Sequence, residues 1–158
     1  MRYGDVTFTE NGKLGEIENL IAMIGASKRE QKENQEISFE EYSNQRMNEK
    51  IAGDWFLYAS DEEQKIEYDR ELKHRADHRE IFAGFEEDYK FQLEEKLKNA
   101  DFGVISHYLS ERKKTYQEAQ SKQNKDNSLE KRENASQIEA TIYAQNRVKV
   151  LDAKNKSK

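Results

Sequence analysis

Apolar residues recur at helical spacing over the longest patterned stretch of the chain, from Ser60 to about Ala100. Most of them lie three or four positions apart, namely Tyr68, Leu72, Ala76, Phe82, Phe85, Tyr89, Leu93, Leu97 and Ala100. This spacing places them on one stripe of a helix. Ser60 and Glu63 predict where the helix starts, because a serine and a glutamate three positions apart form a capping box. Gly84 allows the alternative of a kink or of two shorter helices, since glycine costs about 1 kcal/mol in a helix interior.

Shorter apolar stripes predict up to four further helices. Their ranges are 14–32, 39–58, 104–119 and 129–151. The last of them carries only Ile138, Ile142 and Val148 as its stripe. We therefore expect that helix to be either a poorly packed extension or half of an intermolecular coiled coil. The predicted fold class is all-α, an elongated bundle of four to five helices around one long central helix.

The first thirteen residues do not show helical spacing. Val6 and Phe8 alternate with threonines, which is typical of a strand, and Asn11 and Gly12 form a tight-turn dipeptide. No returning strand follows, because the first helix starts at Leu14. We expect a short extended N-terminal arm that packs on the body. The alternative is a strand that adds to a sheet edge of a partner or of a second copy.

The composition limits how much core the chain can build. Leu, Ile, Val and Phe together number 30 of 158 residues, about 19%, which is close to the range of disordered chains, although the net charge of −5 is modest. We expect a thin core with flexible segments, and the alternative is a core that a partner subunit completes in an oligomer. The pattern divides the chain into a helical body over residues 1–120, and a polar linker, sparse helix and basic tail over residues 121–158.

Several classes of function are disfavoured by what the sequence lacks. There is no cysteine, which excludes disulfides and thiol chemistry, and no apolar run approaches the length of a membrane span. A cytoplasmic protein without membrane contact is the expectation. The glycines do not form a phosphate-cradling loop, so we predict neither an enzyme nor a cofactor.

Glu71, His74 and His78 are the one metal-like group in the pattern, because they lie one helical turn apart. A di-iron bundle would need the motif twice. Arg75 and Arg79 stand beside the histidines and would repel a cation. We expect solvated face residues and no metal site.

Aromatic residues supply the strongest candidates for a binding surface. Trp55 and Tyr58 are the first and last residues of the densest apolar cluster of the chain, residues 55–58. Phe82, Phe85 and Tyr89 follow on the predicted long helix. These five side chains are either core residues or partner-binding anchors, and the sequence does not separate the two roles. The leading hypothesis is a non-enzymatic adaptor, inhibitor or assembly factor that binds proteins through its helical surfaces.

The charge distribution favours a second hypothesis. Residues 1–101 hold 25 acidic and 15 basic residues, whereas residues 102–158 hold 7 and 12. Five basic side chains could contact the phosphates of a nucleic acid, namely Arg112, Lys113, Lys114, Lys131 and Arg132. We expect the first three of them on the solvent-facing side of the helix predicted over residues 104–119. Alternatively, the acidic body occupies a basic groove on a partner.

Overall fold

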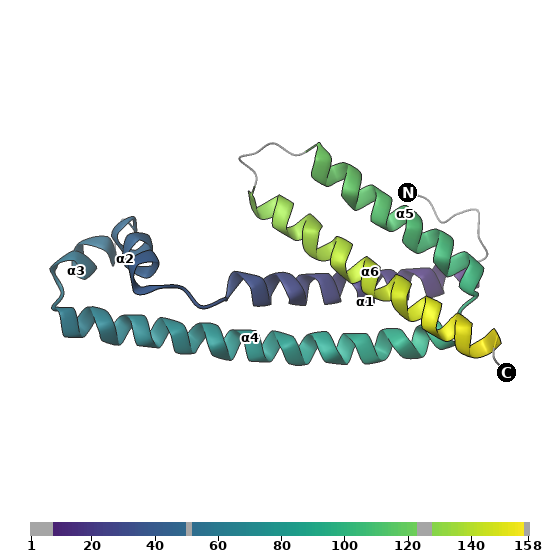
Figure 1. The fold of residues 1–158 in the computed structure, drawn as a ribbon, viewed down its shortest axis with the longest axis horizontal. Helices are drawn as coiled ribbons and strands as arrows, with labels where there is room; N and C mark the ends of the chain where they lie inside the picture. Colours follow the sequence, from purple (N-terminus) through teal and green to yellow (C-terminus); the bar gives the residue numbers. More distant parts are fainter. Residues whose placement is uncertain (1–7, 50–51, 123–127, 157–158) are drawn as a thin grey trace. The chain divides into compact units, whose positions relative to one another are not determined.

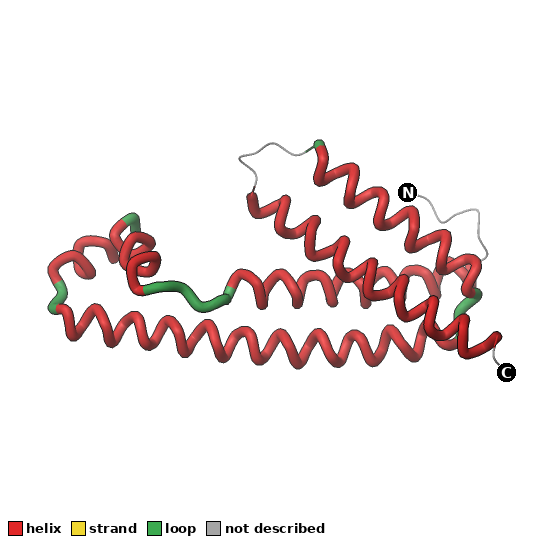
Figure 2. The backbone as a smooth tube through the Cα atoms, in the orientation of Figure 1, coloured by secondary structure: helices red, strands yellow, loops and turns green. Residues whose placement is uncertain are grey.

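The structure is a computed structural model that describes residues 8–49, 52–122 and 128–156. The described residues form six α-helices and no strand (Figures 1 and 2), which confirms the all-α fold class. The helices are α1 (Phe8–Glu33), α2 (Phe39–Met47), α3 (Ala52–Tyr58), α4 (Asp61–Lys98), α5 (Phe102–Ser121) and α6 (Ser128–Lys156). In these same ranges, no helix combines the length and the apolar character that crossing a membrane requires.

The long central helix is confirmed as α4, which runs for 38 residues without interruption. The backbone N–H of Glu63 donates to Ser60 Oγ at 3.2 Å, and the backbone N–H of Ser60 donates to Glu63 Oε1 at 3.4 Å, so the capping box forms as predicted. The helix continues through Gly84, where a Cβ would have no atom within 4 Å apart from its chain neighbours and the backbone of its own helical turns. The cost of this one exposed glycine is therefore only its backbone entropy.

Two predicted boundaries are wrong. The sequence predicts an extended arm over residues 1–13, but α1 already begins at Phe8, and residues 1–7 lie outside the described ranges. Asn11 and Gly12 favour a turn only through local propensity, which is a weak influence beside the packing of a long helix. The single helix predicted over residues 39–58 is instead α2 and α3, which raises the number of helices above five.

The corner between α2 and α3 depends on Gly53. A Cβ on Gly53 would lie 2.8 Å from the carbonyl oxygen of Met47, at the end of α2. Only a residue without a side chain fits so close to another backbone. The spacing of apolar residues in the sequence does not reveal this break, because these residues keep helical spacing on both sides of it.

The described chain divides into two compact units. Unit 1 comprises Met1–Arg29 and Ala83–Lys158, and unit 2 comprises Glu30–Phe82. The core of unit 1 is built from thirteen buried side chains of α1, α4, α5 and α6. They are Leu14, Ile17, Ile21, Ile24, Leu93, Leu97, Ile105, Tyr108, Leu109, Ala140, Ala144, Val148 and Leu151.

The last helix is better packed than its sparse apolar stripe predicts. Ala140 and Ala144 of α6 are fully buried, and α6 lies beside α5. Small side chains let two helices approach closely, so this contact does not need large apolar residues. Arg147 Nε also donates to Glu94 Oε1 of α4 at 2.7 Å. The inner face of α6 therefore belongs to the core of its own chain.

Unit 2 has a smaller interior. Its buried aromatic side chains are Tyr42 and Phe56, whose ring centroids lie 5.6 Å apart in an edge-to-face arrangement. Arg75 Nη1 and Arg79 Nη1 of α4 donate to backbone carbonyls at and just beyond the end of α1, at 3.1 Å from the oxygen of Glu33 and 2.6 Å from the oxygen of Asn34. These arginines satisfy helix-terminal acceptors that have no partner within the helix.

Candidate protein-binding surface

Unit 2 exposes more large apolar side chains than it buries. Among its described residues, seven large hydrophobic side chains are exposed, while Tyr42 and Phe56 are buried. The exposed ones are Phe39, Met47, Trp55, Leu57, Tyr58, Ile66 and Ile81. Large apolar groups on a surface become informative when they gather on one element. They do so on α3, and we call Trp55, Leu57 and Tyr58 the α3 surface.

The exposure of the α3 surface follows from the way α3 packs within unit 2. Phe56 is fully buried, so its neighbours Trp55 and Leu57 turn away from the interior, with exposed fractions of 46% and 54%. Tyr58 is 84% exposed. Gln64 of α4 donates to the carbonyl oxygen of Phe56 at 2.7 Å and holds the end of α3. The surface thus presents aromatic groups on a fixed backbone.

Two shallow hollows lie around this part of unit 2. The first is a notch of about 300 Å³ that is lined by Asp54, Trp55, Tyr58, Ala59 and Glu63. The second, of about 330 Å³, is lined by Phe39, Asp61, Gln64, Lys65 and Tyr68. Both hollows combine aromatic rings with carboxylates, so each offers an apolar contact and a charged contact together.

The acidic character of the chain concentrates in this unit. Residues 30–82 contain 15 Asp and Glu against 8 Lys and Arg, a balance of −7. The whole chain has a net charge of −5. The α3 surface is therefore an aromatic surface within an acidic unit.

The five predicted anchors are divided between the two units. Trp55 and Tyr58 share the notch in unit 2. Phe82 is half-buried, with its ring centroid 4.7 Å from that of His78. Phe85 and Tyr89 belong to unit 1, where Tyr89 packs against the core and Phe85 is 46% exposed. Sequence reasoning does not place Phe39 beside Tyr68, because these positions are 29 apart and only the fold brings their rings to 5.3 Å.

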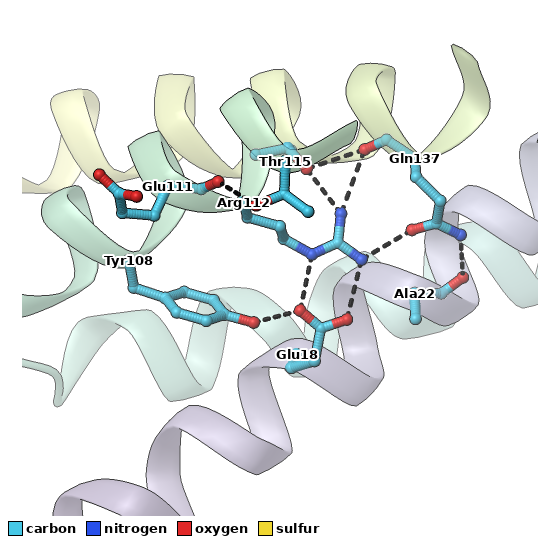
Figure 3. A network of polar contacts seen from close by, with 8 residues as sticks. Glu18, Ala22, Tyr108, Glu111, Arg112, Thr115 and Gln137 are labelled. Atoms are coloured by element: carbon cyan, nitrogen blue, oxygen red, sulfur yellow. Dashed lines mark hydrogen bonds and ion pairs between the residues drawn. The ribbon is translucent and has the colours of Figure 1, made fainter. Parts of the chain in front are cut away.

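Arg112 lies inside unit 1, so the prediction that it faces solvent is wrong. It is 5% exposed, and Nε and Nη2 donate to the two carboxylate oxygens of Glu18 at 2.7 and 2.9 Å (Figure 3). Nη2 also donates to Gln137 Oε1 at 2.7 Å, while Nη1 donates to Thr141 Oγ1 at 2.7 Å and to the carbonyl oxygen of Gln137 at 3.3 Å. All five N–H groups of the guanidinium are thus used.

The surrounding polar contacts complete a network between α1, α5 and α6. The hydroxyl of Tyr108 donates to Glu18, and Gln137 Nε2 donates to the carbonyl oxygen of Ala22 at 3.0 Å (Figure 3). Burial lowers the pKa of Arg112, but its hydrogen bonds and its attraction to Glu18 outweigh burial and hold that pKa above the ordinary value. The guanidinium therefore stays charged, and its task in this chain is to join three helices.

The position of Gln137 depends on Gly25 of α1. A Cβ on Gly25 would lie 2.8 Å from Gln137 Oε1 and would overlap the rest of that amide. Gln137 cannot turn away without losing its bonds to Arg112 and to Ala22. Glycine at position 25 therefore lets the network reach α1.

The other predicted basic residues lie on the surface of unit 1. Lys113 is half-buried, and Lys114, Lys131 and Arg132 are exposed. Lys113 lines a hollow of about 240 Å³ between α5 and α6. Its other lining residues are Ser106, Leu109, Gln145, Val148 and Lys149, with no carboxylate among them.

Two members of the metal-like group on α4, Glu71 and His78, form polar contacts within unit 2. His78 Nε2 lies 3.1 Å from Glu30 Oε2, and Arg75 Nε donates to Glu71 Oε2 at 3.2 Å. His74 is exposed, as the sequence predicts, whereas His78 is half-buried. Across the described residues, no three His, Cys, Asp or Glu side chains stand close enough to hold a metal ion together.

Comparisons of the chain with protein-family models, with curated proteins and with solved structures find no match.

Proposed function

We propose that this chain is a non-enzymatic interaction protein, an adaptor, inhibitor or assembly factor, that binds a partner protein through the α3 surface. The single observation that carries the proposal is the exposure of Trp55, Leu57 and Tyr58 on α3, while Phe56 of the same short helix is fully buried. Tryptophan and tyrosine dominate the energetic centres of protein interfaces. They bury a large area and lose little conformational freedom, because each has only two side-chain torsions.

The rigidity of α3 supports this proposal. Phe56, Gly53 and the bond from Gln64 fix the helix against α2 and α4 before any partner arrives. A surface that is ordered in advance loses less entropy on binding. The polar residues around it, such as Asp54 and Glu63, match the polar rim that surrounds the centre of an interface.

The experiment that tests the proposal is selection of binding peptides from a random phage-displayed library on the full chain. The selected peptides are then measured on the W55A/Y58A variant and on F91A. Phe91 of α4 belongs to unit 1 and is 67% exposed, so F91A removes an exposed aromatic ring that lies outside the α3 surface.

We expect peptides that bind the wild-type chain and F91A equally and lose binding to W55A/Y58A. Both changes remove exposed side chains, so the fold and its circular dichroism spectrum should stay unchanged. A selection whose peptides bind all three proteins alike would overturn the proposal.

A second candidate function, association with nucleic acid, is favoured by the hollow between α5 and α6. Lys113 and Lys149 line it together with Ser106 and Gln145, which can also donate hydrogen bonds. Lys114, Lys131 and Arg132 would add contacts to phosphates. Arg112 is left out, because its guanidinium is used inside the chain.

This second function predicts binding of DNA or RNA that weakens steeply with salt, since phosphate contacts release counterions. Fluorescence anisotropy with labelled single-stranded and duplex oligonucleotides measures it. K113E/K149E should abolish binding, and K65E in unit 2 is the control. An affinity that does not change with K113E/K149E would remove this candidate.

A further inference from the structure

We infer that the notch beside α3 binds an arginine or lysine side chain of the partner protein. This inference rests on the proposed function, because it names the chemistry that the α3 surface recognises. The site is the hollow of about 300 Å³ that is lined by Asp54, Trp55, Tyr58, Ala59 and Glu63.

The aromatic side of the notch suits a cation. Trp55 and Tyr58 are three positions apart, so their rings stand on the same side of α3, and both line the notch. The face of an aromatic ring attracts a positive charge that lies within about 6 Å of its centre, and tryptophan does so best. An arginine side chain has a planar head that stacks on such rings, which makes it the better fit of the two basic residues.

The acidic side of the notch supplies the opposite charge. Asp54 and Glu63 are its only charged lining residues. Glu63 makes its capping contacts to Ser60 through Oε1. A carboxylate has a second oxygen with its own acceptor positions. A guanidinium in the notch would thus meet a ring face and a carboxylate at once.

The charge of the whole unit narrows the class of partner. Residues 30–82 carry a balance of −7, which attracts a basic protein segment and repels phosphates and acidic segments. Leu57 and the hollow beside Phe39 and Tyr68 provide apolar contacts within the same unit. The occupant is therefore a protein segment that places a basic residue among apolar residues.

The chain contains a direct probe of this site. Trp55 is its only tryptophan, so the indole fluorescence of the full chain reports on the notch alone. The test is a titration with a short blocked peptide of arginine, leucine and serine. The matched ligand is the same peptide with citrulline, which keeps the shape of arginine but carries no charge.

We expect the arginine peptide to change the Trp55 emission and to bind at least about fivefold more tightly than the citrulline peptide, because the cation–ring attraction and the ion pair are both lost with the charge. Higher salt should reduce the difference in affinity between the arginine peptide and the citrulline peptide.

The variant D54N/E63Q tests the carboxylates. Glutamine serves in a capping box as glutamate does, so α4 should start unchanged. The control is D77N/E80Q, which removes the same charge from two exposed residues of α4 in unit 2. D54N/E63Q should remove the preference for arginine over citrulline, and D77N/E80Q should keep it.

The outcomes separate this inference from the proposed function. If both peptides change the emission equally, the α3 surface binds protein segments but does not select a cation, and this inference alone fails. If D77N/E80Q and D54N/E63Q weaken binding alike, the attraction comes from the unit as a whole and the notch is not the site. If neither peptide binds and the library selection also finds no site-dependent peptide, both proposals fail.

Discussion

Arg112 of α5 and Glu18 of α1 stand 94 positions apart in sequence and form a two-pronged ion pair, with Nε and Nη2 at 2.7 and 2.9 Å from the two carboxylate oxygens. The arginine is buried and the side chain of glutamate is 32% exposed. A pair of this geometry fixes direction as well as distance. It therefore sets the register in which α1 and α5 meet.

Removing the guanidinium should destabilise the chain strongly. R112A removes the donors that Arg112 supplies to Glu18, Gln137 and Thr141, and of the donors to Glu18 described above it leaves the hydroxyl of Tyr108. Removing one partner of a buried pair costs about 3–5 kcal/mol, and we expect the lower end of this range because water reaches the carboxylate of Glu18. Urea unfolding followed by circular dichroism measures the loss. K114A is the matched control, because Lys114 is two positions away and exposed, and it should change stability by less than about 0.5 kcal/mol.

Two glycines of α1 should respond to alanine in opposite directions. G25A drives a methyl group into the amide of Gln137, so we expect destabilisation of about 1–3 kcal/mol. The methyl group of G15A meets no atom within 4 Å beyond its chain neighbours and the backbone of its own helical turns, so G15A should stabilise the chain by about 0.5–1 kcal/mol through helix propensity. Thermal unfolding of the two variants tests the pair. Equal effects of the same sign would contradict the close approach of Gln137.

Arg79 should stabilise unit 2 through the carbonyl that it binds. Its Nη1 donates to the backbone oxygen of Asn34 at 2.6 Å, just beyond the end of α1. A hydrogen bond from a charged donor contributes about 1.5–3 kcal/mol, less where water reaches it. We expect R79A to speed hydrogen exchange in the last turn of α1. R70A is the control, because the side chain of Arg70 is 74% exposed and pairs with Glu67 of its own helix.

The stability of unit 2 should fall at alkaline pH because of Tyr42. Burial raises the pKa of its phenol above the ordinary value of about 10. Below that value the phenol is neutral in both states, and its contribution to stability is complete. As the pH rises further, the unfolded chain loses its proton first, and this contribution is lost as the pH passes the raised pKa.

The variant Y42F isolates this effect. Phenylalanine keeps the ring that packs against Phe56 and removes the titrating hydroxyl. The urea midpoint should therefore fall less above pH 10 in Y42F than in the wild type. Parallel curves for the two proteins between pH 9 and pH 11 would show that Tyr42 does not carry the alkaline loss.

Local signals explain which parts of the fold the sequence predicts. The start of α4 follows from Ser60 and Glu63, and its course follows from a stripe of apolar residues, because both depend on neighbours within one or two turns. The break between α2 and α3 does not follow, since it depends on how closely Gly53 approaches the carbonyl of Met47. Such a contact leaves no mark in the spacing of apolar positions.

The burial of polar residues is the main feature of the fold that local sequence patterns do not predict. Arg112 stands beside Lys113 and Lys114 in sequence, but it follows the buried residues Tyr108 and Leu109 by four and three positions and so falls on the core-facing stripe of α5. Spacing alone does not show that a charged side chain finds partners there. Its partners Glu18 and Gln137 lie on α1 and α6. The candidate site was more accessible to prediction, because Trp55 and Tyr58 share a short helix. That they are exposed depends on Phe56, which alone of that cluster is fully buried.

Self-association stays a prediction. The packing of α6 changes which surface of that helix a second copy could contact. Ala140 and Ala144 are buried in the core of their own chain, whereas Ile142 and Val150 are 38% and 39% exposed. A dimer would have to use the outer face of α6 or another exposed surface such as that of α3. Light scattering during size-exclusion chromatography gives the mass of the particle. A dimer that W55A/Y58A dissociates would identify a second copy as an occupant of the α3 surface.

The contact between Gly25 and Gln137 also constrains how this sequence can diverge. Space for a side chain at position 25 exists only if the residue at position 137 becomes shorter, and a shorter residue there gives up a bond to Arg112. Related chains with this fold should therefore vary at positions 25, 112 and 137 together. In an alignment of such chains, an alanine at position 25 beside an unchanged arginine and glutamine should be selected against.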